Sequence, residues 1–198
     1  MNLVTLPSIP YPLSWQRAAL DWNVDGGRLS LTADAQTDLF IDPLGNKALH
    51  NAPRLLFEPE GDFLLSARVT VDFQSTFDAG VLVLYQSDTS WAKLCFEYSP
   101  QRDPMVVSVV TRGSSDDCNS AFIDGNDIYL RIARIGQAFA FHHSTDGRRW
   151  HLVRVFRLEE AGTEVGFLAQ APTGKRCTAT FSEIDFTAAT LQDIRSGD

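Results

Sequence analysis

Short segments in which apolar and polar residues alternate recur along the whole chain, and turn residues separate them. The segments LDWNV and RLSLTA, for example, flank Asp25, Gly26 and Gly27. Alternation with a period of two is typical of half-buried strands, and an Asp-Gly pair between two such segments indicates a hairpin. Helical periodicity is almost absent, and only residues 188–197 suit one short helix. The pattern repeats about every 8 to 14 residues, which predicts an all-β sandwich or barrel of about 12–14 strands.

Size and composition favour one β-rich domain. The chain has 198 residues, of which 44% are hydrophobic, and phenylalanine alone occurs 13 times. Aromatic residues suit pleated, half-buried surfaces, and all-β domains often reach this length. We therefore expect a single domain over residues 1–198, with its core at about 14–187.

The charge of the chain argues against two classes of partner. The net charge is −8, and the most basic run is the short GKRC at 174–177. Nucleic-acid binding depends on clustered Lys and Arg that contact phosphates. No apolar run approaches the 18 or so residues that a membrane-spanning helix needs. We therefore expect neither a nucleic acid nor a membrane as partner, and the sequence leaves the oligomeric state open.

The three cysteines, Cys95, Cys118 and Cys177, lie far apart and form no Cys-x-x-Cys pair. Structural zinc sites usually need such a pair, so we expect no metal and no other cofactor. Reduced thiols are typical of the cytosol. The first 15 residues have no basic n-region and are interrupted by three prolines, so we predict no secretory signal and a cytoplasmic protein.

Eight segments occur in an order that resembles a known family. They are TDLFIDP, NAPRLLF, FDAGVLVLY, WAKLCFEYSP, VVSVVTRGSSDDCNS, YLRIAR, FHHSTDGRRWHLVRVF and VGFLAQAPTGKRCTATFS. Over about residues 14–187 they resemble a domain-of-unknown-function family typified by the yeast regulation of enolase protein one. The resemblance implies the concanavalin A-like lectin and glucanase superfamily, whose members are jelly-roll sandwiches of two antiparallel sheets. In such members one sheet curves and its outer face forms a groove. The biochemical activity of the family is not established.

The segment TSWAKLCFEYSP, at 89–100, has an unusual polar face. In a strand, successive side chains point to opposite sides. Ala92 and every second residue after it in the strand are largely apolar and point to one side, whereas Trp91, Lys93 and Glu97 point to the other. A face that only meets solvent does not need the tryptophan. Two interpretations stay open: Lys93 and Glu97 pair with each other as surface charges, or they line a ligand groove.

Polar faces of other strands extend this candidate groove. Ser108 and Arg112 join it if the valines on either side of Ser108 face the core. Arg131 and His142 lie opposite the apolar residues of their own strands. Aromatic rings together with planar polar groups suit a sugar or a small polar ligand. The predicted groove residues are Tyr85, Trp91, Lys93, Glu97, Ser108, Arg112, Arg131 and His142.

The polar segment TRGSSDDCNS is interpreted as a loop at the rim of the groove. Its Asp116, Asp117 and Asn119 carry oxygen atoms that suit a hard cation, but their spacing does not match an EF-hand loop. We therefore favour contact with a ligand or with Arg112 over metal binding at this rim.

Two further carboxylates, Asp38 and Asp78, lie beside apolar residues. A carboxylate near a core needs a hydrogen-bond or charge partner, for which Arg54 or Arg131 is available. We expect a buried pair or a turn cap at each. Gln170 is expected to point into the groove from a neighbouring strand.

The same strand argues against glucanase chemistry. Sandwich glucanases of the superfamily place carboxylates at alternate positions, as Glu-x-Asp-x-Glu, and these positions here hold Lys93, Cys95 and Glu97. One carboxylate cannot supply both the nucleophile and the acid. We therefore predict a non-catalytic, lectin-like protein that binds a carbohydrate or a small polar metabolite. Two alternatives remain: a protein-interaction regulator of carbon metabolism, and a glycoside-active enzyme with an atypical carboxylate pair.

Overall fold

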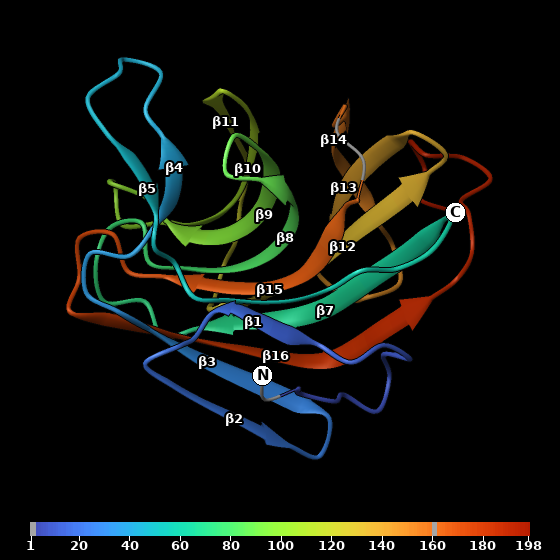
Figure 1. Ribbon diagram of the computed structural model, residues 1–198, viewed down its shortest axis with the longest axis horizontal. Helices are drawn as coiled ribbons and strands as arrows, with labels where there is room; N and C mark the ends of the chain where they lie inside the picture. The colour runs from blue at the N-terminus through green and yellow to red at the C-terminus, as the bar shows by residue number, and fades with distance from the viewer. Residues whose placement is uncertain (1–2, 160–161) are drawn as a thin grey trace.

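Two seven-stranded antiparallel sheets make up most of the computed structural model, which describes residues 3–159 and 162–198 (Figure 1). Sheet I has the strand order β1-β6-β15-β8-β9-β10-β11, and sheet II has the order β14-β13-β12-β7-β16-β3-β2. Side chains from the two sheets share one core, which confirms the predicted all-β sandwich.

The strand bounds are as follows. Sheet I contains β1 (Ser14–Arg17), β6 (Arg54–Phe57), β15 (Glu164–Gln170), β8 (Ala79–Ser87), β9 (Ser90–Tyr98), β10 (Pro104–Arg112) and β11 (Ser114–Phe122). Sheet II contains β14 (His151–Arg157), β13 (Ala138–Ser144), β12 (Asp127–Ile135), β7 (Phe63–Val71), β16 (Arg176–Thr187), β3 (Arg28–Asp34) and β2 (Asp21–Asp25). A separate hairpin consists of β4 (Leu39–Ile41) and β5 (Ala48–His50).

The described chain contains 16 strands, which is more than the sequence predicted. The additional strands include β1, β4 and β5, which have only three or four residues and are too short to show alternation. The predicted hairpin at Asp25 is confirmed, because β2 and β3 pair across Gly26 and Gly27, which both have positive φ. Across the described residues, no helix has the length and apolar character needed to cross a membrane.

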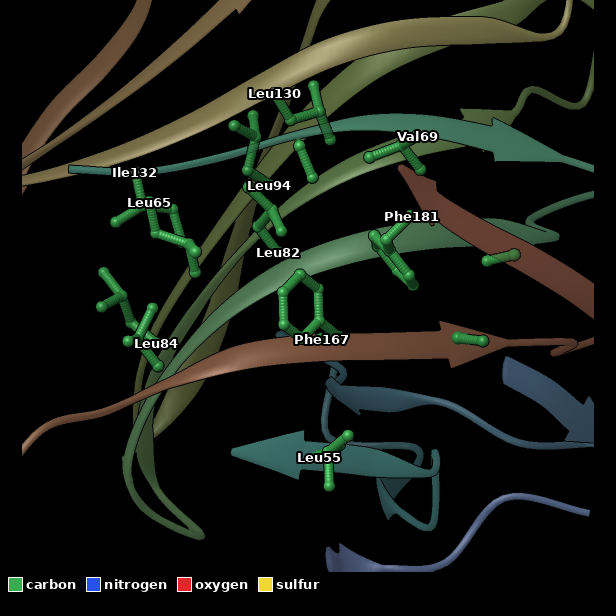
Figure 2. Packing of buried hydrophobic residues seen from close by; sticks show 14 of the residues in the cluster. Leu55, Leu65, Val69, Leu82, Leu84, Leu94, Leu130, Ile132, Phe167 and Phe181 are labelled. Atoms are coloured by element: carbon green, nitrogen blue, oxygen red, sulfur yellow. The ribbon is translucent and has the colours of Figure 1, made fainter. Parts of the chain in front are cut away.

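The main core lies between the two sheets. In β7 of sheet II, buried and partly exposed residues alternate over the whole strand, so that Leu65 and Val69 face inward. They belong to one cluster with Leu130 of β12 and with Leu82 and Leu94 of sheet I (Figure 2). Burial of one such side chain contributes about 1.5–3 kcal/mol, so this layer supplies most of the apolar driving force for folding.

Sheet I is also buried on its outer face, where β8, β9 and β10 lie side by side. Each of these strands contains seven consecutive buried residues. Leu39 of the β4–β5 hairpin belongs to an outer cluster with Val83 and Val109 of the sheet. The Ile41 N–H donates to Ser115 Oγ of β11 at 2.9 Å, which ties the hairpin to the edge of the sheet. Sheet I therefore carries a second apolar layer outside the sandwich.

In β10, the residues predicted to face the core lie on the outer face of sheet I, and those predicted to face the groove lie on the inner face. Val107 and Val109 belong to the outer cluster, whereas Val106 and Val110 belong to the core between the sheets. Ser108 shares the inward face and is buried, so the expectation that it lines the groove is wrong. The segment MVVSVV is apolar on both faces, and alternation therefore cannot define which face points inward.

The C-terminal segment packs on the outer face of sheet II without forming a helix. Leu191 and Ile194 contact an apolar patch that contains Ala133 and Ala140. Residues 188–197 form turns and irregular backbone, so the predicted short helix is wrong. Tertiary contacts with the sheet decide the conformation here, because so short a helix is marginal without packing.

Replacement of a core phenylalanine tests the assignment of the inner layer. Phe167 is fully buried, and Phe167→Ala should lower the free energy of unfolding by about 3–5 kcal/mol. Phe122 is 70% exposed, and Phe122→Ala should change it by less than about 0.5 kcal/mol. Urea denaturation followed by circular dichroism measures both values. Equal effects of the two substitutions would contradict the assignment.

Candidate functional site

A pocket of about 170 Å³ opens on the outer face of sheet I, beside the β4–β5 hairpin. Strands β9, β10 and β15 contribute its floor, the hairpin contributes one wall, and β11 contributes to the rim. The lining residues are Asp38, Phe40, Lys47, Phe77, Lys93, Glu97, Val107, Val109, Asp117, Gln170, Pro172 and Thr173. The pocket therefore combines charged groups with apolar walls.

Lys93 is the central charged group of the pocket floor, and it is only 2% exposed. Its Nζ donates to Asp38 Oδ1 at 3.1 Å and to Gln170 Oε1 at 2.8 Å. Burial lowers the pKa of Lys93, but the neighbouring acidic groups, led by Asp38, raise it, and the net shift is upward. Lys93 thus stays charged, and its ion-pair partner is Asp38 rather than Glu97.

Backbone hydrogen bonds fix Asp38 in place. The Asp38 N–H donates to Asn51 Oδ1 at 2.9 Å, and the Asp38 carbonyl accepts from the Asn51 N–H at 3.0 Å. The Leu39 N–H donates to Asp38 Oδ1 at 2.7 Å. The predicted buried pair at Asp38 is confirmed, with Lys93 as its partner in place of the expected arginines.

Glu97 is partly exposed at the floor of the pocket. Its Oε2 lies 3.4 Å from Gln170 Nε2, which donates to it. Burial raises the pKa of Glu97 to about 8; Lys93 opposes this shift, whereas Asp38 and Asp117 add to it. Near neutral pH, Glu97 is therefore mostly a carboxylic acid, which can donate a hydrogen bond as well as accept one.

Phe77, rather than Trp91, presents an aromatic surface to the pocket. Trp91 is fully buried, with its ring centroid 5.9 Å from Lys93 Nζ, so no ligand reaches it. Phe77 is 38% exposed and has a φ of 70°, which is rare for a bulky residue. Strained backbone of this kind concentrates at functional sites. The Phe77 carbonyl accepts from Gln170 Nε2 at 3.1 Å, which connects this loop to the pocket floor.

Asp78 holds the same loop through a turn cap. Its Oδ2 accepts from the Gln74 N–H at 3.0 Å and from the Ser75 N–H at 2.8 Å. Burial raises the pKa of Asp78, although these two hydrogen bonds oppose the shift. The predicted turn cap at Asp78 is therefore confirmed.

Tyr85 and Arg112 belong to sheet I but do not line the pocket. The Tyr85 hydroxyl donates to Asp88, and the Arg54 guanidinium lies 4.6 Å from the centroid of the Tyr85 ring. Arg112 Nη2 donates to the Arg157 carbonyl at 2.6 Å and connects β10 of sheet I to β14 of sheet II. Both predicted groove residues thus make contacts within the fold.

Arg131 and His142 lie on the outer face of sheet II, on the opposite side of the sandwich. Arg131 lies 4.2 Å from the centroid of the Trp150 ring, and it donates to the Gly197 carbonyl at 2.6 Å. His142 Nε2 lies 2.9 Å from the Ile194 carbonyl oxygen. The expectation of one shared groove is wrong for both residues, because β12 and β13 belong to sheet II.

The acidic segment at 114–122 is the edge strand β11 and not a loop. Asp117 pairs with Val109 of β10 and lines the pocket, whereas Asp116 points the other way and forms a 3.1 Å ion pair with Arg154 of sheet II. Asn119 is exposed and does not line the pocket. Edge strands often carry charged residues, which is why the sequence resembled a loop. In the described ranges, no group of three or more His, Cys, Asp or Glu residues could hold a metal ion.

Several pocket residues carried no signal in the sequence. Phe40, Phe77, Pro172 and Thr173 come from short or irregular segments, where periodicity gives no information about direction. Gln170 was expected to point toward this face and lies within the pocket lining. The structure thus retains Lys93, Glu97 and Asp117 from the predicted set and surrounds them with residues from distant loops.

Comparison with known proteins identifies similar sequences and folds. A family model described as "Protein of unknown function (DUF1349)" matches residues 15–189. No curated protein matches the chain.

Solved structures with a similar fold include the following three. A functionally unknown protein from Saccharomyces cerevisiae has a TM-score of 0.83 at 24% identity, over 90% of this chain and 97% of its own. A mutant of the GH43 protein BlXynB from Bacillus licheniformis has a TM-score of 0.72 at 19% identity, over 89% of this chain but only 37% of its own. The carbohydrate-binding module CBM66 from Bacillus subtilis has a TM-score of 0.54 at 15% identity, over 88% of this chain and 95% of its own. At these identities the likeness shows the fold alone.

A double-mutant cycle tests the ion pair in the pocket floor. Lys93→Met leaves the Asp38 carboxylate without its partner and should lower the free energy of unfolding by about 3–5 kcal/mol. Asp38→Asn should also destabilise the protein, and the double variant should lose less than the sum of the two. Urea denaturation of all four proteins gives the coupling energy. Additive effects would show that the two side chains do not interact.

The pH dependence of stability tests the burial of His142. Burial lowers the pKa of His142 from 6.5 to about 4, so the unfolded chain binds this proton more readily than the folded protein does. The stabilisation is therefore present above pH 6.5 and is lost as the pH falls through about 4. His142→Gln removes the titrating group, so the stability difference between the wild type and the variant should shift in favour of the variant as the pH falls from 6.5 to 4. A constant difference over that range would contradict a buried, neutral His142.

Proposed function

The chain belongs to the DUF1349 family, whose members are described as proteins of unknown function, and we propose that its outer pocket binds a carbohydrate or another small polar metabolite without transforming it. The observation that carries this proposal is the charged group at the pocket floor. Lys93, Asp38 and Gln170 are buried together under a pocket whose walls include the apolar side chains of Phe40, Phe77 and Pro172.

The polar groups of the pocket suit a ligand rich in hydroxyl groups. The Lys93 ammonium has three N–H groups, and within the described part of the chain two of them have partners in Asp38 and Gln170. Glu97 and Asp117 add further hydrogen-bonding groups. A sugar hydroxyl can donate to a carboxylate and accept from an ammonium at the same time, so one ring satisfies several of these groups.

The size and the walls of the pocket favour a single small ring. Its volume of about 170 Å³ is below the range of about 300–1,000 Å³ that is usual for drug-sized ligands. Phe40 and Phe77 supply aromatic surface, on which the apolar face of a sugar can stack. Wider hollows, such as the 580 Å³ one beside Tyr129 and Trp150, are more open to solvent.

The comparisons support this proposal by analogy. The solved structures with this fold include a carbohydrate-binding module, a GH43 protein and a protein titled a xylan β-1,4-xylosidase. The chain spans only about a third of the length of the latter two chains, so their activity does not support a catalytic role for it. For the glycoside-active alternative, Lys93 already engages the Asp38 carboxylate, which leaves Glu97 and Asp117 as the carboxylates of the pocket for a catalytic pair.

A protein-interaction regulator remains the second candidate. Leu20, directly before the edge strand β2, is 59% exposed, and Trp22, within β2, is 41% exposed. Exposed apolar residues at a sheet edge favour contact with another protein. The link to enolase and the cytoplasmic location belong to this candidate and stay predictions.

A thermal-unfolding screen tests ligand binding. The neutral panel is D-xylose, L-arabinose, D-glucose, D-galactose and D-mannose, and phosphorylated glycolytic intermediates form an acidic panel. A ligand at one hundred times its Kd stabilises the folded state by about 2.7 kcal/mol, which raises the Tm by roughly 5–10 °C for a chain of this size. At least one sugar should produce such a rise.

Matched variants locate the site. Phe77→Ala should abolish most of the rise, whereas Phe122→Ala, which removes an exposed phenylalanine outside the pocket, should retain it. Variants of Lys93 are unsuitable here because they break the ion pair that supports the fold. An absence of any shift across both panels would contradict ligand binding and favour the protein-interaction candidate.

A further inference from the structure

Gln170 has only one possible orientation of its side-chain amide. Its Oε1 faces Lys93 Nζ at 2.8 Å, and an ammonium can only donate. Its Nε2 faces the Phe77 carbonyl at 3.1 Å, and a carbonyl can only accept. The amide group that faces Glu97 must therefore be the Nε2 donor, at 3.4 Å from Glu97 Oε2.

One oxygen of Glu97 thus accepts a hydrogen bond from Gln170, and the second oxygen is available to a ligand in the pocket. Glu97 is partly exposed, so a ligand in the pocket can reach it. The hydrogen bond from Gln170 is long, and Lys93 is shared between Asp38 and Gln170. Neither the hydrogen bond from Gln170 nor the charge of Lys93 therefore compensates a full negative charge on Glu97.

The titratable groups that surround Glu97 come from four elements. Strand β9 carries Lys93 and the neutral Cys95 thiol, the segment before β4 carries Asp38, the β4–β5 loop carries Lys47, and β11 carries Asp117. Strand β10 contributes only valines to the lining. Lys47 and Asp117 are exposed at the rim, while Asp38 and Lys93 neutralise each other. An ionised Glu97 would therefore make the pocket net negative.

The pocket is also richer in acceptors than in donors. The carboxylates of Asp38 and Asp117 can only accept, and only Lys93 is a charged donor in the floor. A sugar ring contains an oxygen that can only accept, because it carries no hydrogen. Lys93 has one N–H group left for a ligand and Lys47 lies at the rim, so a protonated Glu97 is the further donor that the floor offers to that oxygen while the hydroxyl groups use the acceptors.

We infer that Glu97 binds the ligand as a protonated carboxylic acid, whose second oxygen donates its hydrogen to an accept-only ether oxygen of a neutral sugar. This inference rests on the proposed function and specifies the chemistry of the same pocket. Ionisation of Glu97 removes the donor and adds a negative charge, so alkaline solution should release the ligand. The pKa of Glu97, raised by burial to about 8, places this loss just above neutral pH.

Isothermal titration at pH 7 and pH 9.5 with the five neutral sugars tests the inference. From a pKa of about 8, the fraction of protonated Glu97 falls about 30-fold between these two pH values, and affinity should fall by the same factor. Lys93 keeps its charge in this range, because its pKa lies above its usual value of 10.5. Circular dichroism at both pH values verifies that the protein stays folded.

Glu97→Gln is the matched variant, because an amide donates a hydrogen bond at both pH values. It should bind the same sugar at pH 7 and lose less than about threefold in affinity at pH 9.5. Wild-type affinity that is constant or rises toward pH 9.5 would overturn the inference while leaving the proposed function intact, because Glu97 would then act as an acceptor. A Glu97→Gln variant with the same 30-fold loss would also overturn it. If no sugar binds at either pH, both the proposed function and the inference fail.

Discussion

Lys93 carries a positive charge on the apolar outer face of sheet I, and the arrangement of the candidate site depends on how that charge is compensated. Removal of two ions from water costs several kcal/mol per ion, so such a pair needs good geometry and further hydrogen bonds. Asp38, from the segment before β4, and Gln170, from β15, meet this need at 3.1 and 2.8 Å. Gln170 also bonds the Phe77 carbonyl, so one buried charge connects the floor of the pocket to its aromatic wall.

The second apolar layer explains why a pocket exists at this place. A sheet with one buried face would present polar residues to solvent on the other, but β8, β9 and β10 are buried on both faces. The β4–β5 hairpin covers part of the outer face, and Val107 and Val109 lie at the bottom of the pocket beside it. The sheet is curved and the short β4–β5 hairpin stands beside it (Figure 1). Together they form a small, partly apolar site, and the described chain contains no helix.

The sequence predicted the sandwich and the faces of β9, because WAKLCFEY has one apolar face and one mixed face. It did not predict the faces of β10, where valines on both sides of the strand make alternation uninformative. It also assigned Arg131 and His142 to the groove, since a polar outward face looks the same in either sheet of a sandwich. The partner of Lys93 lies 55 residues away in the chain, in a segment whose direction only the folded structure reveals.

We propose a lectin-like protein in which Lys93, Glu97 and the Phe77 side chain line the pocket that would bind one neutral ring. The most direct test is an amide NMR spectrum of the labelled protein during titration with the neutral sugar that raises the Tm most. The account predicts that the side-chain amide signals of Gln170 and the backbone signals of Val107 and Val109 shift together and saturate. Shifts confined to Tyr129 and Trp150 in the hollow on sheet II would contradict it.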